Sequence, residues 1–582
     1  MPTDPEALLA DLNPEQREAA TATSGPVVIL AGAGTGKTRV ISHRAAYGAA
    51  TGALDPRRGL IVTFTEKAAT EMRYRLRALG MPQVQASTFH AAARRQLAHF
   101  WPERRGQPLP DVLESKARIV GPLARGLPGG YRFTPAKDLA DEIEWAKVRR
   151  QTPATYAPDR EPPVPADVFV RLWRGYESAK QRRSVIDFED MLTLAVDLYE
   201  TDADARSLVH RRYAWFSVDE YQDTNRLQED LLRCWLGDRR DLCVVGDPDQ
   251  TIYTFTGASA HYLETFADRY PGARVVRLSR NYRSTPDVLA LANRLIPGRE
   301  LRTDAPSGPP PELVPPADGE AERTAIAERI RRLAANGVPF TEIAILVRTN
   351  AQLVGFEAAL TAAEIPFTVR GIRFYARPEV RAAIRALRGA ETTGRLSRIV
   401  ATRWRRELGF DEADPPGPAS GSEARDRHAA LATLLAVARD LEAQQPDATV
   451  ADYLADLARR DDAEATAEAA GGGVTLSTLH RAKGLEWDAV FLPQLEEGTL
   501  PIRQATSATD PGALAEERRL LYVGVTRARR HLVLSWAGSR VGAKGSPART
   551  RASRFVAELR PNAVARPVPK SGRASAPGAA VP

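Results

Sequence analysis

The chain has 582 residues, of which 43% are hydrophobic, and a formal net charge of +8. Its length corresponds to roughly three or four domains, and no run approaches the about 18 apolar residues that span a membrane. The N-terminal segment lacks the basic start and apolar middle of a signal peptide, and Cys234 and Cys243 form no CxxC pair that would indicate a metal or disulfide framework. We therefore expect a cytoplasmic protein with no membrane partner.

Short apolar runs alternate with helical periodicity along the chain. Most of these runs are apolar throughout, as in parallel strands that helices cover on both faces. The predicted strands are residues 26–30, 60–64, 215–219, 242–246, 273–278, 342–347, 474–479, 489–495 and 531–536. Nine strands are too many for one small sheet, so we predict an α/β fold with two parallel sheets.

Two stretches between these strands, residues 104–206 and 384–469, show helical periodicity and few strand signals. Each is predicted to be a mostly helical insertion into one sheet domain. Residues 308–316 (GPPPELVPP) indicate a surface loop, and residues 471–473 (GGG) indicate a linker. The predicted domains are 1–103 with 207–272 (first sheet domain), 104–206 (first insertion), 273–383 with 470–560 (second sheet domain), 384–469 (short second insertion) and 561–582 (disordered tail).

The stretch AGAGTGKT, residues 31–38, follows the first predicted strand and begins a predicted helix. In a P-loop, backbone N–H groups surround phosphates, the lysine reaches the terminal phosphates and the hydroxyl binds Mg²⁺, while the helix dipole favours the anion. These roles fall to Lys37 and Thr38, after the loop residues Ala31, Gly32, Ala33, Gly34, Thr35 and Gly36. Ala31 stands where the strict pattern has glycine, and a simple glycine-rich turn is the alternative.

Polar residues that suit nucleotide hydrolysis follow several other strands. Asp219 and Glu220 end one strand, where Asp219 is predicted to hold Mg²⁺ and Glu220 to polarise the attacking water. Gln250 follows the next strand and can sense the γ-phosphate. Arg283 and Arg527, in the second half of the chain, are candidates for neutralising charge on that phosphate.

Aromatic and basic residues near these motifs are candidates for nucleic-acid binding. Tyr253 and Phe255 follow Gln250 closely and can stack on bases, although core packing is the alternative. The basic stretch 539–554 (SRVGAKGSPARTRASR) can contact phosphates or form a solvated surface.

The motifs follow one another in a fixed order from residue 12 to about residue 531. They read LNPEQREAA, AGAGTGKT, TFTEKAATEM, STFH, DFEDML, VDEYQDTN, VVGDPDQTIY, LSRNYRST, LVRTNAQ, RFYARPEV, TLHRAKGLEWDAVFLP and EERRLLYVGVTRARRHL. In this series the chain resembles UvrD/Rep/PcrA-type superfamily 1A DNA helicases. The resemblance implies two RecA-like P-loop domains, each with a mostly helical insertion, with ATP and Mg²⁺ between them and single-stranded DNA across both.

The resemblance also implies movement in the 3′ to 5′ direction, tailed duplex DNA as a substrate, and a role in DNA repair or replication restart. Repair proteins are expected partners, and a nucleoid-associated monomer or weak dimer is the expected form. By position, Gln16 is expected to read the adenine edge, with Arg39 beside the base and Tyr282 stacked on it. Glu486 is expected to contact the ribose, while Gln250, Arg283 and Arg527 face the γ-phosphate.

The DNA contacts implied by the resemblance come from both halves of the chain. They are Phe64, Thr65, His90, Tyr253, Phe255, Arg348, Asn350 and His480. For His90 and His480, a structural histidine is the alternative.

Three departures from the family pattern leave the exact activity open. Phe255 and Thr256 stand where the family usually has tryptophan and arginine, Glu66 stands where asparagine is common, and the second insertion is short. A DNA-dependent ATPase and 3′ to 5′ helicase is the first hypothesis. A single-strand translocase that strips proteins and needs a partner to unwind is the second, and an ATP-switched DNA-binding scaffold without motor activity is the third.

Overall fold

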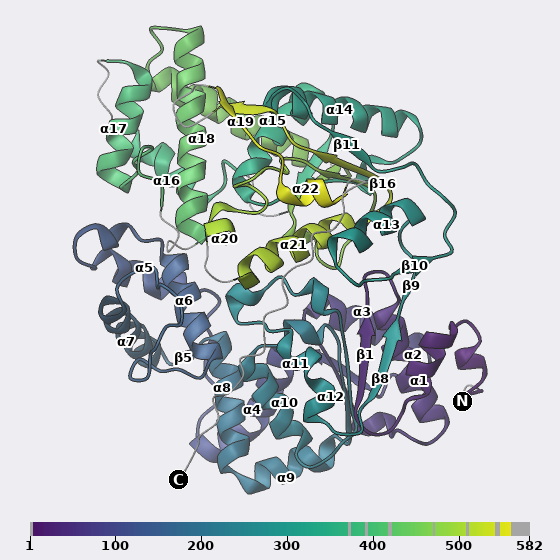
Figure 1. Ribbon diagram of the computed structural model, residues 1–582. Helices are drawn as coiled ribbons and strands as arrows, with labels where there is room; N and C mark the ends of the chain where they lie inside the picture. Colours follow the sequence, from purple (N-terminus) through teal and green to yellow (C-terminus); the bar gives the residue numbers. More distant parts are fainter. Residues whose placement is uncertain are drawn as a thin grey trace, which may run out of the picture.

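The computed structural model describes residues 4–370, 374–389, 394–416, 422–469, 472–507, 511–541 and 547–559. Within these residues two six-stranded sheets, each parallel throughout, form the centres of two sheet domains (Figure 1). The predicted α/β fold with two parallel sheets is therefore confirmed. No helix among the described residues is long and apolar enough to cross a membrane.

The first sheet lies at the centre of the first sheet domain. Its strands, in spatial order, are β3 (Gln85–Thr88), β2 (Gly59–Thr63), β6 (Trp215–Val218), β7 (Leu242–Gly246), β1 (Val27–Ala31) and β8 (Arg274–Leu278). β8 pairs with β1, and Val275 lies opposite Val28. The predicted boundary between residues 272 and 273 is wrong, because β8 completes the first sheet.

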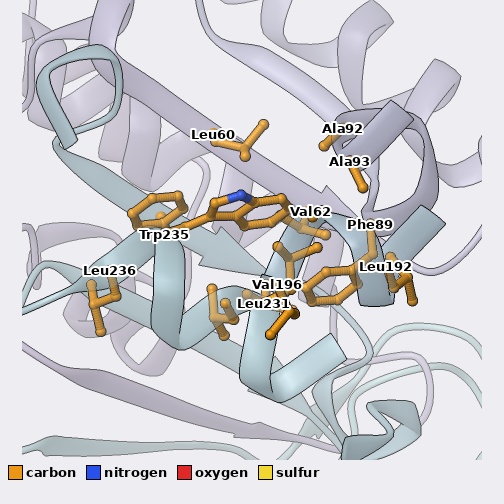
Figure 2. Close-up of a cluster of buried hydrophobic side chains, with 14 of the residues drawn as sticks. Leu60, Val62, Phe89, Ala92, Ala93, Leu192, Val196, Leu231, Trp235 and Leu236 are labelled. Carbon is orange, nitrogen blue, oxygen red and sulfur yellow. The ribbon is translucent and has the colours of Figure 1, made fainter. Parts of the chain in front are cut away.

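Helices pack on both faces of the first sheet. They are α1 (Pro14–Thr21), α2 (Lys37–Ala50), α3 (Glu66–Ala78), α4 (Phe89–Arg105), α8 (Phe188–Thr201), α9 (Ala203–Arg212), α10 (Arg226–Leu236), α11 (His261–Glu264) and α12 (Phe266–Arg269). Alternate residues of β2 point to opposite faces, so Leu60 and Val62 join one core cluster and Ile61 joins another. In the first cluster Trp235 stacks on Phe89 with ring centroids 5.8 Å apart (Figure 2).

The first insertion is smaller than predicted. It contains α5 (Ala117–Arg125), α6 (Ala136–Val148) and α7 (Ala166–Arg183), flanked by the short pair β4 (Asp111–Val112) and β5 (Val185–Ile186). Its own core runs from Ile119 to Ala179. Met191 and Leu192 of α8 lie instead in the core of the first sheet domain. The predicted end at residue 206 is therefore too late, because α8 and α9 cover the sheet.

The second sheet lies at the centre of the second sheet domain. Its strands, in spatial order, are β11 (Glu312–Val314), β16 (Ala528–Ser535), β15 (Trp487–Leu492), β12 (Ile343–Val347), β14 (Val474–Thr478) and β13 (Phe367–Val369). The stretch 308–316, predicted as a loop, contains β11. Proline is tolerated around this strand because it lies at the edge of the sheet and pairs only with β16.

The second sheet is covered by helices from both ends of its sequence. They are α13 (Pro286–Leu295), α14 (Gly319–Ala335), α15 (Leu353–Ala362), α20 (Arg503–Ser507), α21 (Pro511–Val525) and α22 (Arg554–Leu559). Two small pairs complete this domain: β9 (Arg280–Asn281) with β10 (Arg302–Thr303), and β17 (Ser539–Val541) with β18 (Pro547–Arg549).

The second insertion contains α16 (Pro378–Ala386), α17 (Leu396–Leu408), α18 (Ser422–Gln444) and α19 (Val450–Ala469). Its core begins at Phe374, earlier than the predicted boundary at residue 384. The two insertions lie on the same side of the molecule (Figure 1), where the Asp138 carboxylate accepts the N–H groups of Glu423 and Ala424, each at 2.8 Å. The tail predicted to be disordered, residues 561–582, lies outside the described residues, as does Gly471 of the predicted linker.

Candidate functional site

The loop between β1 and α2 lies against the segment that follows β9. Gly34 has φ +69°, and a Cβ added there would lie 2.6 Å from Asn281 Nδ2 and 2.8 Å from Arg283 Cβ. Asn281 Nδ2 also donates to the Ala33 carbonyl at 2.7 Å, and the Tyr282 N–H donates to the Gly34 carbonyl at 2.9 Å. Only glycine fits this close approach, which brings the predicted phosphate loop and Arg283 together.

Lys37 begins α2 directly after this loop, and its ammonium faces Glu220. The Lys37 Nζ to Glu220 Oε1 distance is 3.2 Å. Glu220 follows β6 with φ +51°, a left-handed conformation that is uncommon outside glycine and often occurs at functional sites. Burial alone would raise the pKa of Glu220, but the charges of Lys37 and Lys483 lower it to about 2. Glu220 is therefore ionised at neutral pH, as a group that polarises water must be.

Asp219, at the end of β6, has the features of a cation ligand. Its Oδ1 accepts the N–H of Glu220 at 2.9 Å. Burial, followed by the neighbouring charge of Glu220, raises the pKa of Asp219 to about 7. A nearby cation would favour the charged form of this carboxyl. Mg²⁺ takes oxygen ligands and is commonly bound by one or two carboxylates together with phosphates, so Asp219 and the hydroxyl of Thr38 fit the ion.

The residues predicted to surround the adenine meet on the other side of the loop. Gln16 is buried; its Nε2 donates to the Thr35 carbonyl at 3.0 Å, and its Oε1 accepts the Asn13 N–H at 3.2 Å. Asn13 Nδ2 in turn donates to the hydroxyl of Tyr282 at 2.7 Å. Arg39 lies nearby on α2 and approaches Asp11 at 3.8 Å. The structure thus brings Gln16 and Tyr282 together at the phosphate loop.

Two arginines from the second sheet domain lie beside each other. Arg283 Nη1 donates to the Thr526 carbonyl at 3.1 Å, and its Nε donates to Glu486. Arg527 is buried and donates from Nη1 to the Leu485 carbonyl at 3.1 Å. Burial, followed by the charge of Arg283, lowers the pKa of Arg527 to about 9. Two neighbouring guanidinium groups, of which that of Arg527 is fully buried, favour an anion between the domains.

Glu486 and Gln250 are already engaged by protein groups. Glu486, predicted to contact the ribose, accepts from Arg283 and from Arg529 Nη2, the latter at 2.8 Å. Gln250 Nε2 donates to Asp247 Oδ2 at 2.7 Å. Both side chains are therefore held in place by hydrogen bonds to protein groups.

Lys483 is a residue of the site that the sequence reasoning missed. It comes from the second sheet domain, yet its Nζ lies 2.5 Å from Asp223 Oδ2 and donates to the Gln250 carbonyl at 2.7 Å. Its Nζ also lies 5.2 Å from the centroid of the Tyr253 ring. The signal for it was present in TLHRAKGLEW, where a lysine precedes the glutamate that was singled out. We call the boundary formed by Lys37, Glu220 and Gln250 with Arg283, Lys483 and Arg527 the seam.

Four predicted DNA-binding residues form one row of rings, which we call the aromatic row. It runs from Phe64 through Tyr253 and Phe255 to His480, with successive centroids 6.0, 6.2 and 5.8 Å apart. Phe64 is 38% exposed and Phe255 is 53% exposed. The hydroxyl of Tyr253 donates to the His480 carbonyl at 3.1 Å, so the row crosses the seam. Exposed rings in a row suit the stacking of successive bases.

Comparison with known proteins agrees with this geometry. The model of the UvrD/REP helicase N-terminal domain matches residues 12–271, and that of the UvrD-like helicase C-terminal domain matches residues 276–404 and 396–539. The chain belongs to the UvrD/REP helicase family. The resemblance inferred from the ordered motifs is therefore confirmed, and the two parallel sheets correspond to the two RecA-like domains of such helicases.

Several helicases are similar to the chain over nearly its whole length. It is 44% identical over 598 residues to the ATP-dependent DNA helicase UvrD2 of Mycobacterium tuberculosis, covering 98% of this chain and 84% of the relative. It is 31% identical to DNA helicase II of Escherichia coli, covering 96% and 88%. It is 30% identical to the ATP-dependent DNA helicase PcrA of Staphylococcus aureus, covering 95% and 87%. This UvrD/REP family chain is thus an enzyme of the DNA helicase class.

Two further residues predicted to bind DNA in this helicase lie near the aromatic row on the first sheet domain. His90 lies edge-on to Phe188 at 5.8 Å, and burial, followed by the charge of Lys116, lowers its pKa to about 4. Phe188, the aromatic residue that begins the helix in DFEDML, is 44% exposed and was not among the predicted residues. The hydroxyl of Thr65 accepts the Ala68 N–H at 3.2 Å and so caps α3.

The expected charges along the DNA track are partly neutralised by neighbours. Glu66, which stands where the family has asparagine, pairs with Arg73 at 2.6 Å. Arg348 Nη2 lies 2.8 Å from Glu517 Oε1, so a contact of Arg348 with phosphate requires this ion pair to open. The carbonyl of Asn350 accepts from Arg377 at 3.1 Å.

The basic stretch 539–554 is not uniformly available to phosphates. Its Arg540 pairs with Glu496 at 2.6 Å and also with Glu322, while Arg554 pairs with Glu497 at 2.8 Å. Residues 542–546 of this stretch lie outside the described residues. These pairs favour the alternative in which the stretch forms part of the protein surface.

Proposed function

We propose that the protein is an ATP-dependent 3′ to 5′ helicase and translocase on single-stranded DNA, acting in DNA repair or replication restart. The observation that carries this proposal is the seam, where Arg283, Lys483 and Arg527 of one domain lie against the phosphate loop, acids and sensor of the other. Single-stranded and tailed duplex DNA are the proposed substrates. Repair proteins are proposed partners of a nucleoid-associated cytoplasmic monomer or weak dimer.

For hydrolysis we assign each side chain of the seam a role. Lys37 exchanges its contact with Glu220 for the terminal phosphates, and the ionised Glu220 accepts a proton from the attacking water. Arg283 and Arg527 stabilise the negative charge that develops on the γ-phosphate, the role of an arginine finger. Mg²⁺, held by Thr38 and Asp219, would neutralise phosphate charge when bound.

We assign the coupling between ATP hydrolysis and movement along DNA to Lys483 and Tyr253. Lys483 contacts the carbonyl of the sensor residue Gln250 and lies beside the ring of Tyr253. A rotation of the second sheet domain moves Lys483 and His480 together, because both belong to the segment after β14. Opening and closing the seam would therefore change the spacing between Phe64 and His480, and alternating grip on stacked bases would advance the strand.

The test combines ATP hydrolysis with strand displacement on matched substrates. The purified protein is given duplexes with a 3′ tail or a 5′ tail, on DNA and RNA tracks, with and without ATP. Unwinding of the 3′-tailed DNA alone is expected. Unwinding from the 5′ tail alone would overturn the polarity, and ATP hydrolysis that single-stranded DNA does not stimulate would favour the ATP-switched scaffold.

A second candidate function is a single-strand translocase that strips proteins and needs a partner to unwind. Thr256 favours it, because its hydroxyl donates to the Tyr253 carbonyl at 2.9 Å and it brings no positive charge to the DNA track. Removal of a streptavidin block from single-stranded DNA, without displacement of a duplex, would select this candidate.

A further inference from the structure

Arg299 is a third arginine of the second sheet domain that reaches the first. It lies in the loop after α13, whose Val288 and Leu291 pack in the core of the second sheet domain. Its Nη1 donates to Asp247 Oδ1 at 2.6 Å and pairs with Asp249. Both acids follow β7 of the first sheet domain, so this ion pair joins the two domains beside the phosphate loop.

Asp247 connects this arginine to the hydrolytic groups. Its second oxygen, Oδ2, accepts Gln250 Nε2 at 2.7 Å, and its N–H donates to Gln222 Oε1 at 3.0 Å. Gln222 Nε2 donates in turn to Glu220. One continuous set of hydrogen bonds therefore runs from Arg299 to both the proposed γ-phosphate sensor and the proposed base.

The charges around Asp247 require a cation. Asp247 is fully buried, and Asp249, two residues later, is partly buried. Burial, followed by the charge of Asp247, raises the pKa of Asp249. Two close carboxylates in a buried site repel each other unless a partner is present. Arg299 supplies that partner, and its guanidinium lies over the ring of Tyr522 at 5.4 Å.

Tyr522 places Arg299 next to the other arginines of the seam. It belongs to α21, the helix that ends just before Arg527. On the opposite side, Arg299 Nη2 lies against Gly32 of the phosphate loop, 2.7 Å from the position of an added Cβ. The Arg299 side chain thus contacts the phosphate loop, the loop after β7 that contains Gln250, and α21.

We propose that Arg299 is a positioning residue for ATP hydrolysis. It fixes Asp247, whose carboxylate orients the Gln250 side chain and whose N–H, through Gln222, orients the carboxylate of Glu220. Because Arg299 belongs to the second sheet domain, this orientation is complete only when the seam is closed. The inference rests on the proposed ATPase function and makes the geometry of the sensor depend on domain closure.

The first test compares Arg299→Met with the matched control Arg302→Met. Arg302 lies three residues further on and is exposed, and among the described residues its guanidinium is paired only with Glu300, at 3.6 Å. Misplacing a catalytic group costs roughly 10- to 100-fold in rate, so Arg299→Met should lower the DNA-stimulated kcat by that factor. The KM for ATP should stay within about twofold, because Arg299 is not assigned a contact with ATP. An unchanged kcat would overturn the inference.

The second test asks whether Arg299 acts through Gln250. If it does, adding Arg299→Met to Gln250→Ala should cost clearly less than Arg299→Met costs in the wild type, because residues that act as a unit are not additive. A merely structural contribution would instead reduce the rate of the double variant by the product of the two single losses. Multiplicative losses therefore count against the inference.

The third test needs no nucleotide. The N–H of Gln250 donates to the Asp247 carbonyl at 3.0 Å and that of Asp249 donates to Asp247 Oδ1 at 3.2 Å. Hydrogen–deuterium exchange of these amides should become faster in Arg299→Met and stay unchanged in Arg302→Met. Unchanged exchange in both variants overturns the inference. A wild-type protein that fails to hydrolyse ATP while exchange responds as expected overturns only the proposed function.

Discussion

The contact between the two helical insertions gives a prediction that the structure defines in detail. Asp138, on α6 of the first insertion, caps the N-terminus of α18 in the second by accepting two N–H groups, each at 2.8 Å. Its side chain is almost fully buried. Asp138→Ala removes both acceptors and leaves two backbone N–H groups without this partner. We expect the insertions to separate more often, because no other bond of this kind is made to these two groups in the described part of the chain.

The size of the effect follows from the two bonds and the burial of the acid. A hydrogen bond to a charged group contributes about 1.5–3 kcal/mol, whereas burial raises the pKa of Asp138 and so offsets part of this gain. Loss of an N-cap costs about 0.5–2 kcal/mol in general. We expect the upper end, about 2 kcal/mol, which corresponds to a roughly 30-fold increase in the open fraction.

Hydrogen–deuterium exchange at Glu423 and Ala424 measures this opening directly. Asp138→Asn serves as a matched variant, because asparagine caps helices about as well as aspartate and should retain most of the protection. Asp141→Asn on the same helix, where the partly exposed Asp141 pairs only with Lys137 among the described residues, should change little. Protection at α18 that is equal in Asp138→Ala and wild type would refute the reasoning.

Three further predictions concern the site. Lys37→Ala should reduce ATP turnover at least ~100-fold while single-stranded DNA affinity without nucleotide stays within about twofold, as phosphate release and fluorescence anisotropy would measure. Phe255→Ala should weaken binding of an oligothymidine about 5- to 150-fold, the equivalent of one stacked base at about 1–3 kcal/mol. The control is Tyr74→Ala, which removes an exposed ring on α3. An equal loss of affinity in both variants would contradict the prediction. Burial lowers the pKa of His480 to about 3 and that of His90 to about 4, so below about pH 6.5 the unfolded chain binds more protons than the folded one. The free energy of unfolding should then fall as the pH decreases from about 6.5 toward 4, and His480→Gln, unlike His261→Gln, should flatten that slope in urea denaturation.

The sequence predicts the central strands of both sheets and one edge strand, β8, and misses the other three edge strands. Strands such as β1, β7 and β12 are apolar throughout because helices cover them on both sides. The three missed strands, β3, β11 and β13, lie at sheet edges and are short or partly polar. An edge strand needs less apolar surface, so its sequence resembles a loop. The prediction therefore fails where strands are short or partly polar.

The domain boundaries were misplaced for a related reason. The apolar face of α8 shows that the helix packs against something, but it does not show which core it joins. Only the tertiary arrangement places Met191 beside Phe89 and Trp235 in the first sheet domain. In the same way, residue order does not reveal that Arg299 meets Asp247 or that Lys483 meets Asp223. The motif residues and their gathering at one site could be predicted, whereas these two side-chain pairings could not.

The loop after β7 links the proposed nucleotide site to the proposed DNA site. Its first residue, Asp247, continues a strand of the first sheet, whereas Ile252 is fully buried in the core of the second sheet domain. The Thr251 carbonyl also accepts Arg519 Nε at 2.9 Å, a second link to the second sheet domain. The proposed sensor, Gln250, therefore lies at the point where the chain passes between domains, and Tyr253 follows three residues later. A rotation that opens the seam must strain or release this short segment, so the position of Gln250 and the stacking of Tyr253 change together.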